Sequence, residues 1–273
     1  MRQIFAIIFL IYSGIEICAQ DTSSQRNFDF YPAIRKWYGV KLNPASVYFG
    51  KVSLFGEYSS NNWRHNGRSR SITFGIGIPI EHEQNYIINK KDRKLRMKTF
   101  SAMIGYRVFV VNGFDFPGEI SGLYFEPYLK YLSNSTSDTF NTNLATSTTT
   151  TSEVTFSSVS KYSGVGFGIQ LGYQFHINQR FIVDAFLIGP EINNTNTNIL
   201  LHDITSQGAW NSSQSVDAQK SINDYKKLPI LGNKLNTSRD DVNRNISASY
   251  KGLLPGFRIG ISIGYSFRHE RRS

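Results

Sequence analysis

The chain has 273 residues, 40% of them hydrophobic and 14% aromatic, with a formal net charge of +10. Its mean hydropathy is −0.30, and beyond the N-terminus no stretch approaches the roughly eighteen consecutive apolar residues of a membrane-spanning helix. A helical membrane protein is therefore excluded. A low mean hydropathy does not exclude a protein built of strands that alternate apolar and polar residues.

The N-terminus is typical of a secretory signal peptide. Arg2 precedes an apolar run at residues 4–12, and small residues mark a cleavage point after Ala19. A buried N-terminal strand is the alternative, and lipidation of Cys18 is disfavoured because the residues before it fit a lipobox poorly. We predict a signal peptide at residues 1–19. The mature chain would then lack cysteine, and hence disulfides and thiolate metal sites.

After a polar lead-in at residues 20–34, eight segments alternate apolar residues with small or polar ones. This period of two is typical of β-strands, whose successive side chains point to opposite faces. The segments are residues 35–43, 47–58, 71–81, 98–110, 123–132, 162–177, 181–188 and 257–267. Most of them are about nine to fourteen residues long, which lets a tilted strand cross a hydrocarbon core of about 30 Å.

The connections between these segments differ in length according to their position in the chain. The third, fifth and seventh connections are long and polar, at residues 82–97, 133–158 and 191–255, whereas the sixth is very short. If both termini lie on the periplasmic side, these long connections all lie outside. In a soluble domain, no constraint would make every second connection long, and a long segment without secondary structure would be unusual.

These observations predict an all-β fold, a closed antiparallel up-and-down transmembrane β-barrel of eight strands over residues 35–267. The number of strands is even, as in bacterial outer-membrane barrels. Residues 257–267 should pair with residues 35–43 and remove the sheet edges. Residues 268–273 would then form a basic C-terminal tail.

The polar faces of the expected strands carry charged residues that would meet inside the barrel. An eight-stranded barrel has room only for side chains, and an unpaired charge there would cost several kcal/mol. We predict a lumen plugged by a charge network of Lys41, Lys51, Glu57, Arg107, Glu126, Lys130, Asp184 and Arg258. Arg258 needs a carboxylate, for which Glu57, Glu126 and Asp184 are candidates.

Aromatic residues gather near the expected periplasmic ends of the strands. We predict a periplasmic girdle of Tyr58, Tyr173, Phe175, Phe181, Tyr265 and Phe267, as found where barrels meet the membrane interface. Ordinary preference of aromatic residues for strands is the alternative reason for their presence.

The opening pattern Lys41-Leu42-Asn43, followed by FGKVSLFGEY at residues 49–58, resembles small outer-membrane β-barrels of the OmpA/OmpX type, in the porin-like superfamily. The closing run GISIGYSF at residues 260–267 is similar to the C-terminal signal that the barrel assembly machinery reads. With a signal ending in Ala19-Gln20, the chain is most similar to single-barrel proteins of unknown function from Bacteroidetes. Such proteins usually end on an aromatic residue, whereas this chain continues past Phe267.

No catalytic, cofactor or metal site is expected, since the five histidines do not share metal-ligand spacing. His202 and Asp203, with Ser206 nearby, resemble a lipid-deacylating triad, but we interpret them as polar loop residues. The function expected first is non-enzymatic, structural or surface-binding through the external loops. The alternatives are a narrow channel for small solutes, a lipid A-modifying outer-membrane enzyme, and a soluble periplasmic β-protein.

The positive charge indicates which partners the protein meets. Because an exported chain rarely meets nucleic acid, we expect outer-membrane lipids and the phosphates of lipopolysaccharide as counter-charges. The resemblance adds the barrel assembly machinery as a partner during insertion. The external ligand is unknown, and we expect a monomer in the outer membrane of a Gram-negative bacterium.

Overall fold

Antiparallel strands make up nearly all of the part of the chain that the structure describes. The computed structural model describes residues 35–60, 69–88, 91–112, 120–146, 150–177, 180–205, 208–223 and 234–270. The predicted signal peptide and the lead-in at residues 20–34 lie outside the described residues.

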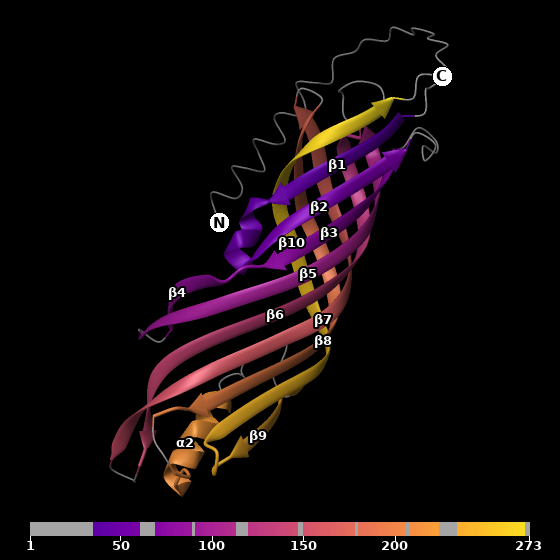
Figure 1. Cartoon of the computed structure of the whole chain (residues 1–273). Helices are drawn as coiled ribbons and strands as arrows, with labels where there is room; N and C mark the ends of the chain where they lie inside the picture. The colour runs from indigo at the N-terminus through magenta and orange to yellow at the C-terminus, as the bar shows by residue number, and fades with distance from the viewer. Residues whose placement is uncertain are drawn as a thin grey trace, which may run out of the picture. The chain divides into compact units, whose positions relative to one another are not determined.

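Eight strands form a closed antiparallel ring (Figure 1). They are β1 (Arg35–Asn43), β2 (Lys51–Ser60), β3 (Arg70–Pro79), β5 (Lys91–Asn112), β6 (Gly122–Ala145), β7 (Thr151–Ile177), β8 (Phe181–Asp203) and β10 (Asn245–Glu270). The last strand pairs with the first, with Tyr38 opposite Phe267 and Leu42 opposite Ile263. The predicted closed up-and-down barrel is confirmed, including the pairing that closes it.

The alternation of the sequence sorts side chains between the inside and the outside of the ring. On β7, Val165 and Phe167 are exposed on the outer surface, while Gln170 and Gln174 are buried inside. This is the reverse of a soluble domain, in which the apolar face packs into the core. The ring therefore has an apolar exterior and a polar interior.

The strands of the ring fall into two length classes. The long strands occupy much of the sequence that was predicted to form loops, so that prediction is corrected. β1, β2 and β3 have 9 or 10 residues, whereas the other five strands of the ring have 22 to 27. Most of the predicted loop 133–158 is strand, because the ends of β6 and β7 continue their ladder as far as Ala145 and Thr151. The Ser, Thr and Asn side chains there do not form an apolar core. The backbone N–H and C=O groups of the two paired strands, however, are satisfied by hydrogen bonds to each other.

The other two predicted loops also contain regular secondary structure. In the range 82–97, β4 (His82–Ile88) forms a hairpin with the beginning of β5. In the range 191–255, β8 continues to Asp203 and β10 begins at Asn245, and between them lie the helix α2 (Ser212–Asn223) and the short strand β9 (Asn236–Asp240). Of the predicted tail 268–273, residues 268–270 belong to β10, and residues 271–273 lie outside the described residues.

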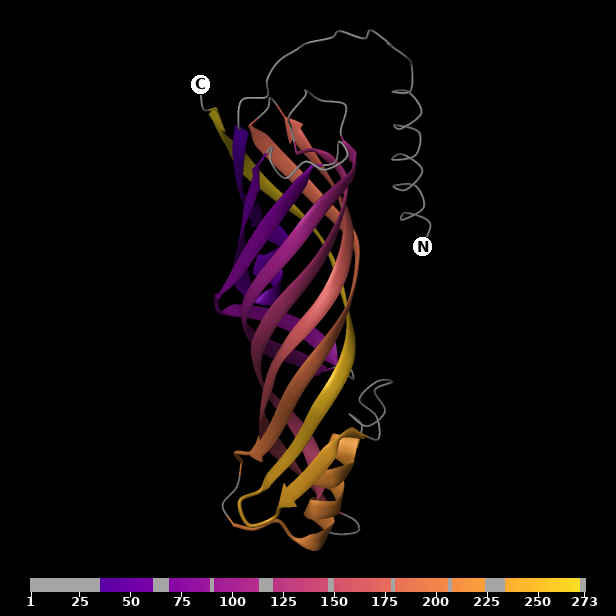
Figure 2. The same cartoon turned by 90° about the vertical axis from the view of Figure 1, so that its right-hand side faces the viewer.

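The long strands continue past the ring and carry α2 and β9 at their far end (Figure 2). We call this part, residues 133–163, 194–223 and 234–251 as far as they are described, the projection. The projection holds an apolar core of Leu144, Val154, Phe156, Leu201, Trp210, Ala218, Leu235, Ile246, Ala248 and Tyr250. The inward positions of the strands thus change from polar in the ring to apolar in the projection.

The helix α2 begins at a capping box. The Asn211 side chain accepts a hydrogen bond from the Gln214 N–H at 2.9 Å, and the Gln214 side chain accepts one from the Asn211 N–H at 3.1 Å. Asp217 also accepts the Ala145 N–H at 3.0 Å, which ties the helix to the end of β6. Among the described residues, no helix is long and apolar enough to cross a membrane.

A 3-10 helix, η1 (Pro44–Phe49), connects β1 to β2 and ends at Gly50, whose φ is 67°. The Gly50 carbonyl accepts hydrogen bonds from the N–H groups of Ile80 and Thr99, both at 3.0 Å. Glycine is the residue best suited to the left-handed conformation of position 50, because it has no Cβ. The short connection is thereby fixed against β5 and the chain that precedes β4.

Candidate functional site: the lumen of the barrel

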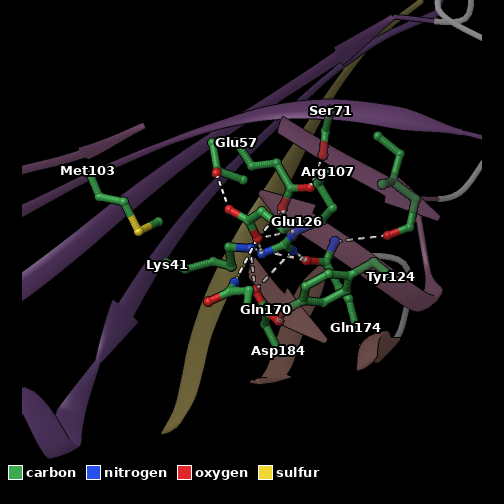
Figure 3. A network of polar contacts seen from close by, with 12 residues as sticks. Lys41, Glu57, Ser71, Met103, Arg107, Tyr124, Glu126, Gln170, Gln174 and Asp184 are labelled. Atoms are coloured by element: carbon green, nitrogen blue, oxygen red, sulfur yellow. Dashed lines mark hydrogen bonds and ion pairs between the residues drawn. The ribbon is translucent and has the colours of Figure 1, made fainter. Parts of the chain in front are cut away.

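A buried cluster of charges crosses the lumen. Lys41 on β1 reaches Glu57 on β2 at 2.7 Å and Asp184 on β8 at 2.6 Å. Figure 3 shows these side chains pointing toward one another, together with Arg107 and Glu126. All five were predicted to face the lumen, and the structure brings them together.

Arg107 on β5 is the second cation of this cluster. Its Nη2 lies 2.7 Å from Glu126 Oε2, and its Nη1 lies 3.0 Å from Asp184 Oδ2 and 3.4 Å from Glu57 Oε2. The guanidinium also lies 3.7 Å from the centre of the Tyr124 ring. Arg107 therefore connects carboxylates that come from three different strands.

Neutral side chains complete the hydrogen bonding of the cluster. Ser71 donates to Glu57 at 2.5 Å, Tyr124 donates to Asp184 at 2.6 Å, and Thr73 donates to Glu126. Gln170 donates to Glu126 at 2.7 Å, and the Gln174 carbonyl accepts from both Lys41 at 3.0 Å and Arg107 at 2.7 Å. We call the five charged residues and these partners the lumen plug.

Two cations in the plug face three carboxylates. Burying charges is costly unless pairing and hydrogen bonds compensate each one, and here every charged group has at least two partners. Gly105 provides the space, because a Cβ at this position would collide with Glu126 and Thr73. Small inward residues therefore make room for the large charged ones.

An apolar layer lies next to the plug, toward the end of the ring where β1 begins. It consists of Trp37, Phe109, Ile120, Tyr124 and Ile182, all buried. On the other side of the plug, a void of about 10 Å³ lies between Arg107, Met103 and Phe186. That is about the space of one water molecule, so the lumen is filled at this level.

A second group of charges lies beyond this void, toward the projection. Lys130 contacts both carboxylate oxygens of Glu191, at 2.6 and 2.7 Å. Glu191 also accepts hydrogen bonds from Tyr128 at 2.9 Å and Asn193 at 3.1 Å. Lys51 donates to Ser101 Oγ at 3.1 Å.

Arg258 departs from the expectation that a carboxylate pairs with it. Its guanidinium contacts Met103 Sδ at 2.6 Å and lies over the rings of Phe186, Tyr128 and Phe55 at 4.6, 5.3 and 5.4 Å. Among the described residues it has no ion pair. Glu57, Glu126 and Asp184 are already engaged by Lys41 and Arg107.

Sequence reasoning missed Glu191, the partner of Lys130. The strand predicted at residues 181–188 ended before Glu191, which was assigned to the external loop 191–255. Instead β8 continues through a β-bulge, at which Leu187 and Ile188 are both exposed on the outside. The bulge shifts the inward positions from even to odd residues, so Glu191 faces the lumen.

The predicted aromatic girdle residues lie near the end of the ring where β1 begins. Phe181 lies 5.7 Å from Tyr265, which lies 5.0 Å from Phe267, measured between ring centres. Tyr173 contacts Phe175 at 5.5 Å, and Tyr58 contacts Tyr38 at 5.2 Å. Tyr38 connects two of these groups, because it is paired with Tyr58 on β2 and with Phe267 on β10.

The candidate triad is not assembled. His202 is exposed and its Nδ1 lies 2.5 Å from Asn245 Oδ1, whereas Asp203 is buried on the opposite face of β8 and accepts from Trp210 Nε1 at 3.0 Å. Ser206 lies outside the described residues. Within the described part of the chain, no group of three or more His, Cys, Asp or Glu side chains is arranged to hold a metal ion.

No protein-family model and no curated protein matches this chain. Among solved structures, the crystal structure of Acinetobacter baumannii CarO is similar over 86% of this chain and 98% of that one, with 10% identity and a TM-score of 0.35. A likeness at this level carries no conclusion about this chain. The affinity to proteins from Bacteroidetes stays a prediction.

Proposed function

We propose that the protein is a non-enzymatic integral barrel of the bacterial outer membrane, with a closed lumen and a projection that presents a binding surface outside the membrane. The observation that carries this proposal is the apolar exterior of a ring whose interior is ionic. On every strand of the ring, large apolar side chains face outward and remain exposed. Only a surrounding apolar phase makes such a surface favourable.

The apolar exterior ends at the same register on neighbouring strands. Tyr131 on β6 is paired with Val165 on β7, and one step further Ser133 is paired with Ser163. On β8 the outward residues change from Ile192 to Asn194 at nearly the same place. This common boundary supports a membrane interface at this level, with the projection beyond it.

The height of the apolar exterior matches a bilayer. On β7 it extends from Val165 to Ile177, which is about 40 Å along the strand at about 3.3 Å per residue. With the tilt of about 35–45° found in such barrels, this corresponds to about 28–33 Å. The hydrocarbon core of a bilayer is about 30 Å thick.

A closed lumen supports a structural or binding role over a channel. The apolar layer and the lumen plug fill the ring, and the next void measures about 10 Å³. A solute would have to break the ion pairs of Lys41 and Arg107 to pass. The projection, by contrast, is an ordered sheet with its own core and helix, as a binding surface requires.

Membrane fractionation tests the proposal. We expect the protein in the outer-membrane fraction, with heat-modifiable migration on gels. Complete release in soluble form upon cell lysis would overturn the proposal and favour the soluble periplasmic alternative. The barrel assembly machinery and lipopolysaccharide remain the proposed partners during and after insertion.

Two further measurements separate the remaining alternatives. Purified protein in planar bilayers should give no stepwise conductance, and regular openings would favour the narrow channel. The mass profile of lipid A should be the same in cells with and without the gene, and a lost modification would favour the enzyme.

A further inference from the structure

The ring opens into a cavity of about 380 Å³ on the projection side of the lumen plug. This is within the range of small-molecule sites. Three basic residues line it, Lys51, Lys130 and Arg258, with a single carboxylate, Glu191. The apolar part of its wall includes Phe49, Phe55, Met97, Met103, Phe186 and Phe257.

Two positive charges in this cavity lack a carboxylate. Glu191 pairs with Lys130. Among the described residues, Lys51 donates only to Ser101, and Arg258 contacts Met103 and aromatic rings. Lys51 is repelled by Lys130 and Arg258 and attracted by Glu191. Partly buried cations that repel one another favour a bound anion.

The β-sheet of the barrel is incomplete beside this cavity, where η1 contacts β10 in place of a paired strand. On the edge of β10 that faces β1, residues 250–262 have no strand partner among the described residues, because β1 pairs only with residues 263–270 and β9 only with residues 245–249. Figure 1 shows β1, β2 and β3 ending well before the long strands do. Residues 255–262 of this free edge lie within the apolar exterior, where Phe257 and Ile259 line both the outer surface and the cavity.

We propose that this cavity binds a single-chain anionic amphiphile, with its carboxylate or phosphate headgroup at Lys51 and Arg258. Its hydrocarbon chain would leave through the gap beside residues 250–262 of β10. The positive charges of Lys51 and Arg258 favour an anionic headgroup. Because the gap lies within the apolar exterior, it favours a ligand that also has a hydrocarbon chain. The inference rests on the proposed membrane insertion for the route of entry, but the charges and the cavity wall do not depend on it.

Binding of radiolabelled dodecanoate to purified protein in a neutral detergent tests the proposal, with protein-free micelles as the background. We expect one dodecanoate per chain. Lys51→Met and Arg258→Met should each weaken binding about tenfold or more, since each removes a charge-assisted contact. Lys161→Met, on the exposed surface of the projection, is the matched control and should bind like the unmodified protein.

Three competitors separate the sources of the anion. Dodecyl phosphate should compete with dodecanoate, whereas dodecanol, which lacks the charge, and butanoate, which lacks the chain, should compete at least about tenfold more weakly. Equal competition by dodecanol would overturn the role of the cations. Equal competition by butanoate would overturn the lateral entry and indicate a soluble anion.

Heat-modifiable migration verifies that each variant is folded, and if Arg258→Met fails this check, Lys51→Met decides. Unchanged binding by a folded Lys51→Met protein would overturn the proposal. Absence of dodecanoate binding by a protein that fractionates with the outer membrane would overturn this inference alone. Release into the soluble fraction would instead overturn the proposed function.

Discussion

Lys41 Nζ and Asp184 Oδ2 lie 2.6 Å apart, although 143 residues separate them in the sequence. Lys41 belongs to β1 and Asp184 to β8, and β10 lies between these strands in the ring. The contact therefore lies inside the lumen and joins two strands that are not adjacent in the sheet. It forms only when the last strand has closed the ring, so charge compensation in the plug depends on barrel closure.

Removal of one plug cation should be strongly destabilising. Arg107→Met leaves Glu126 and Asp184 buried with fewer partners, and we expect the free energy of unfolding to fall by about 3–5 kcal/mol. Arg96→Met is the control, because Arg96 pairs with Glu83 on the surface and such pairs contribute at most about 1 kcal/mol. Urea unfolding in lipid vesicles measures both, and equal effects of the two substitutions would contradict a structural role for the plug.

Space in the lumen should limit which residues are tolerated. Gly105→Ala places a methyl group against Glu126 and Thr73 and should cost about 1–3 kcal/mol, as overpacking does. Gly56→Ala is the matched control, since a Cβ there meets no atom within 4 Å. The same unfolding experiment distinguishes them, and the packing argument fails if Gly105→Ala is as stable as Gly56→Ala.

The ring could be predicted from the sequence because its alternation is nearly unbroken. In residues 162–177, six apolar residues alternate with glycine and glutamine, and a period of two assigns the two faces without knowledge of the partners. The same alternation placed Lys41 and Arg107 inside. The choice of partners could not be predicted, because it depends on which strands face each other across the lumen.

The projection could not be predicted, because its strands lack the signal that marks the ring. Between residues 133 and 158 the described outward positions are mostly Ser, Thr and Asn, and inward apolar residues, such as Phe140 and Phe156, are few. The strands of the projection are stabilised by pairing with long neighbouring strands and by the apolar core beneath α2. The capping box of Asn211 and Gln214 was the local signal that could have identified the helix.

The apolar exterior predicts where a charge is tolerated. Ile104 is exposed near the middle of this surface on β5, and Ile104→Lys should destabilise the inserted protein by about 2–4 kcal/mol, as for a lysine at the bilayer midplane. Asn196→Lys, on the exterior of the projection, should change little. Unfolding from vesicles measures both, and an equally stable Ile104→Lys protein would argue against membrane insertion at this level.

The core of the projection should open in acid because of Asp203. Burial opposes ionisation of this carboxyl, but hydrogen bonds from the Thr205 N–H, Trp210 and Arg244 outweigh burial and hold its pKa below the ordinary value of 3.8. When the pKa of a carboxyl is lower in the folded protein than in the unfolded one, its ionised form stabilises the fold. This stabilisation is fully present above the pKa of the unfolded state and is lost as the pH falls through the pKa of the folded state. The contribution should therefore be constant from pH 7 to about 5 and disappear below about pH 4.

The comparison with Asp203→Asn isolates this contribution from that of other carboxyls. Urea titrations followed by Trp210 fluorescence, with Trp37 and Trp63 replaced by Phe, report on the core of the projection. At pH 7 the substitution should cost about 1–3 kcal/mol, because it leaves Arg244 buried without its anion. The difference between the two proteins should shrink toward zero as the pH falls below about 4, and a difference that is independent of pH would show that the charge of Asp203 does not hold the projection together.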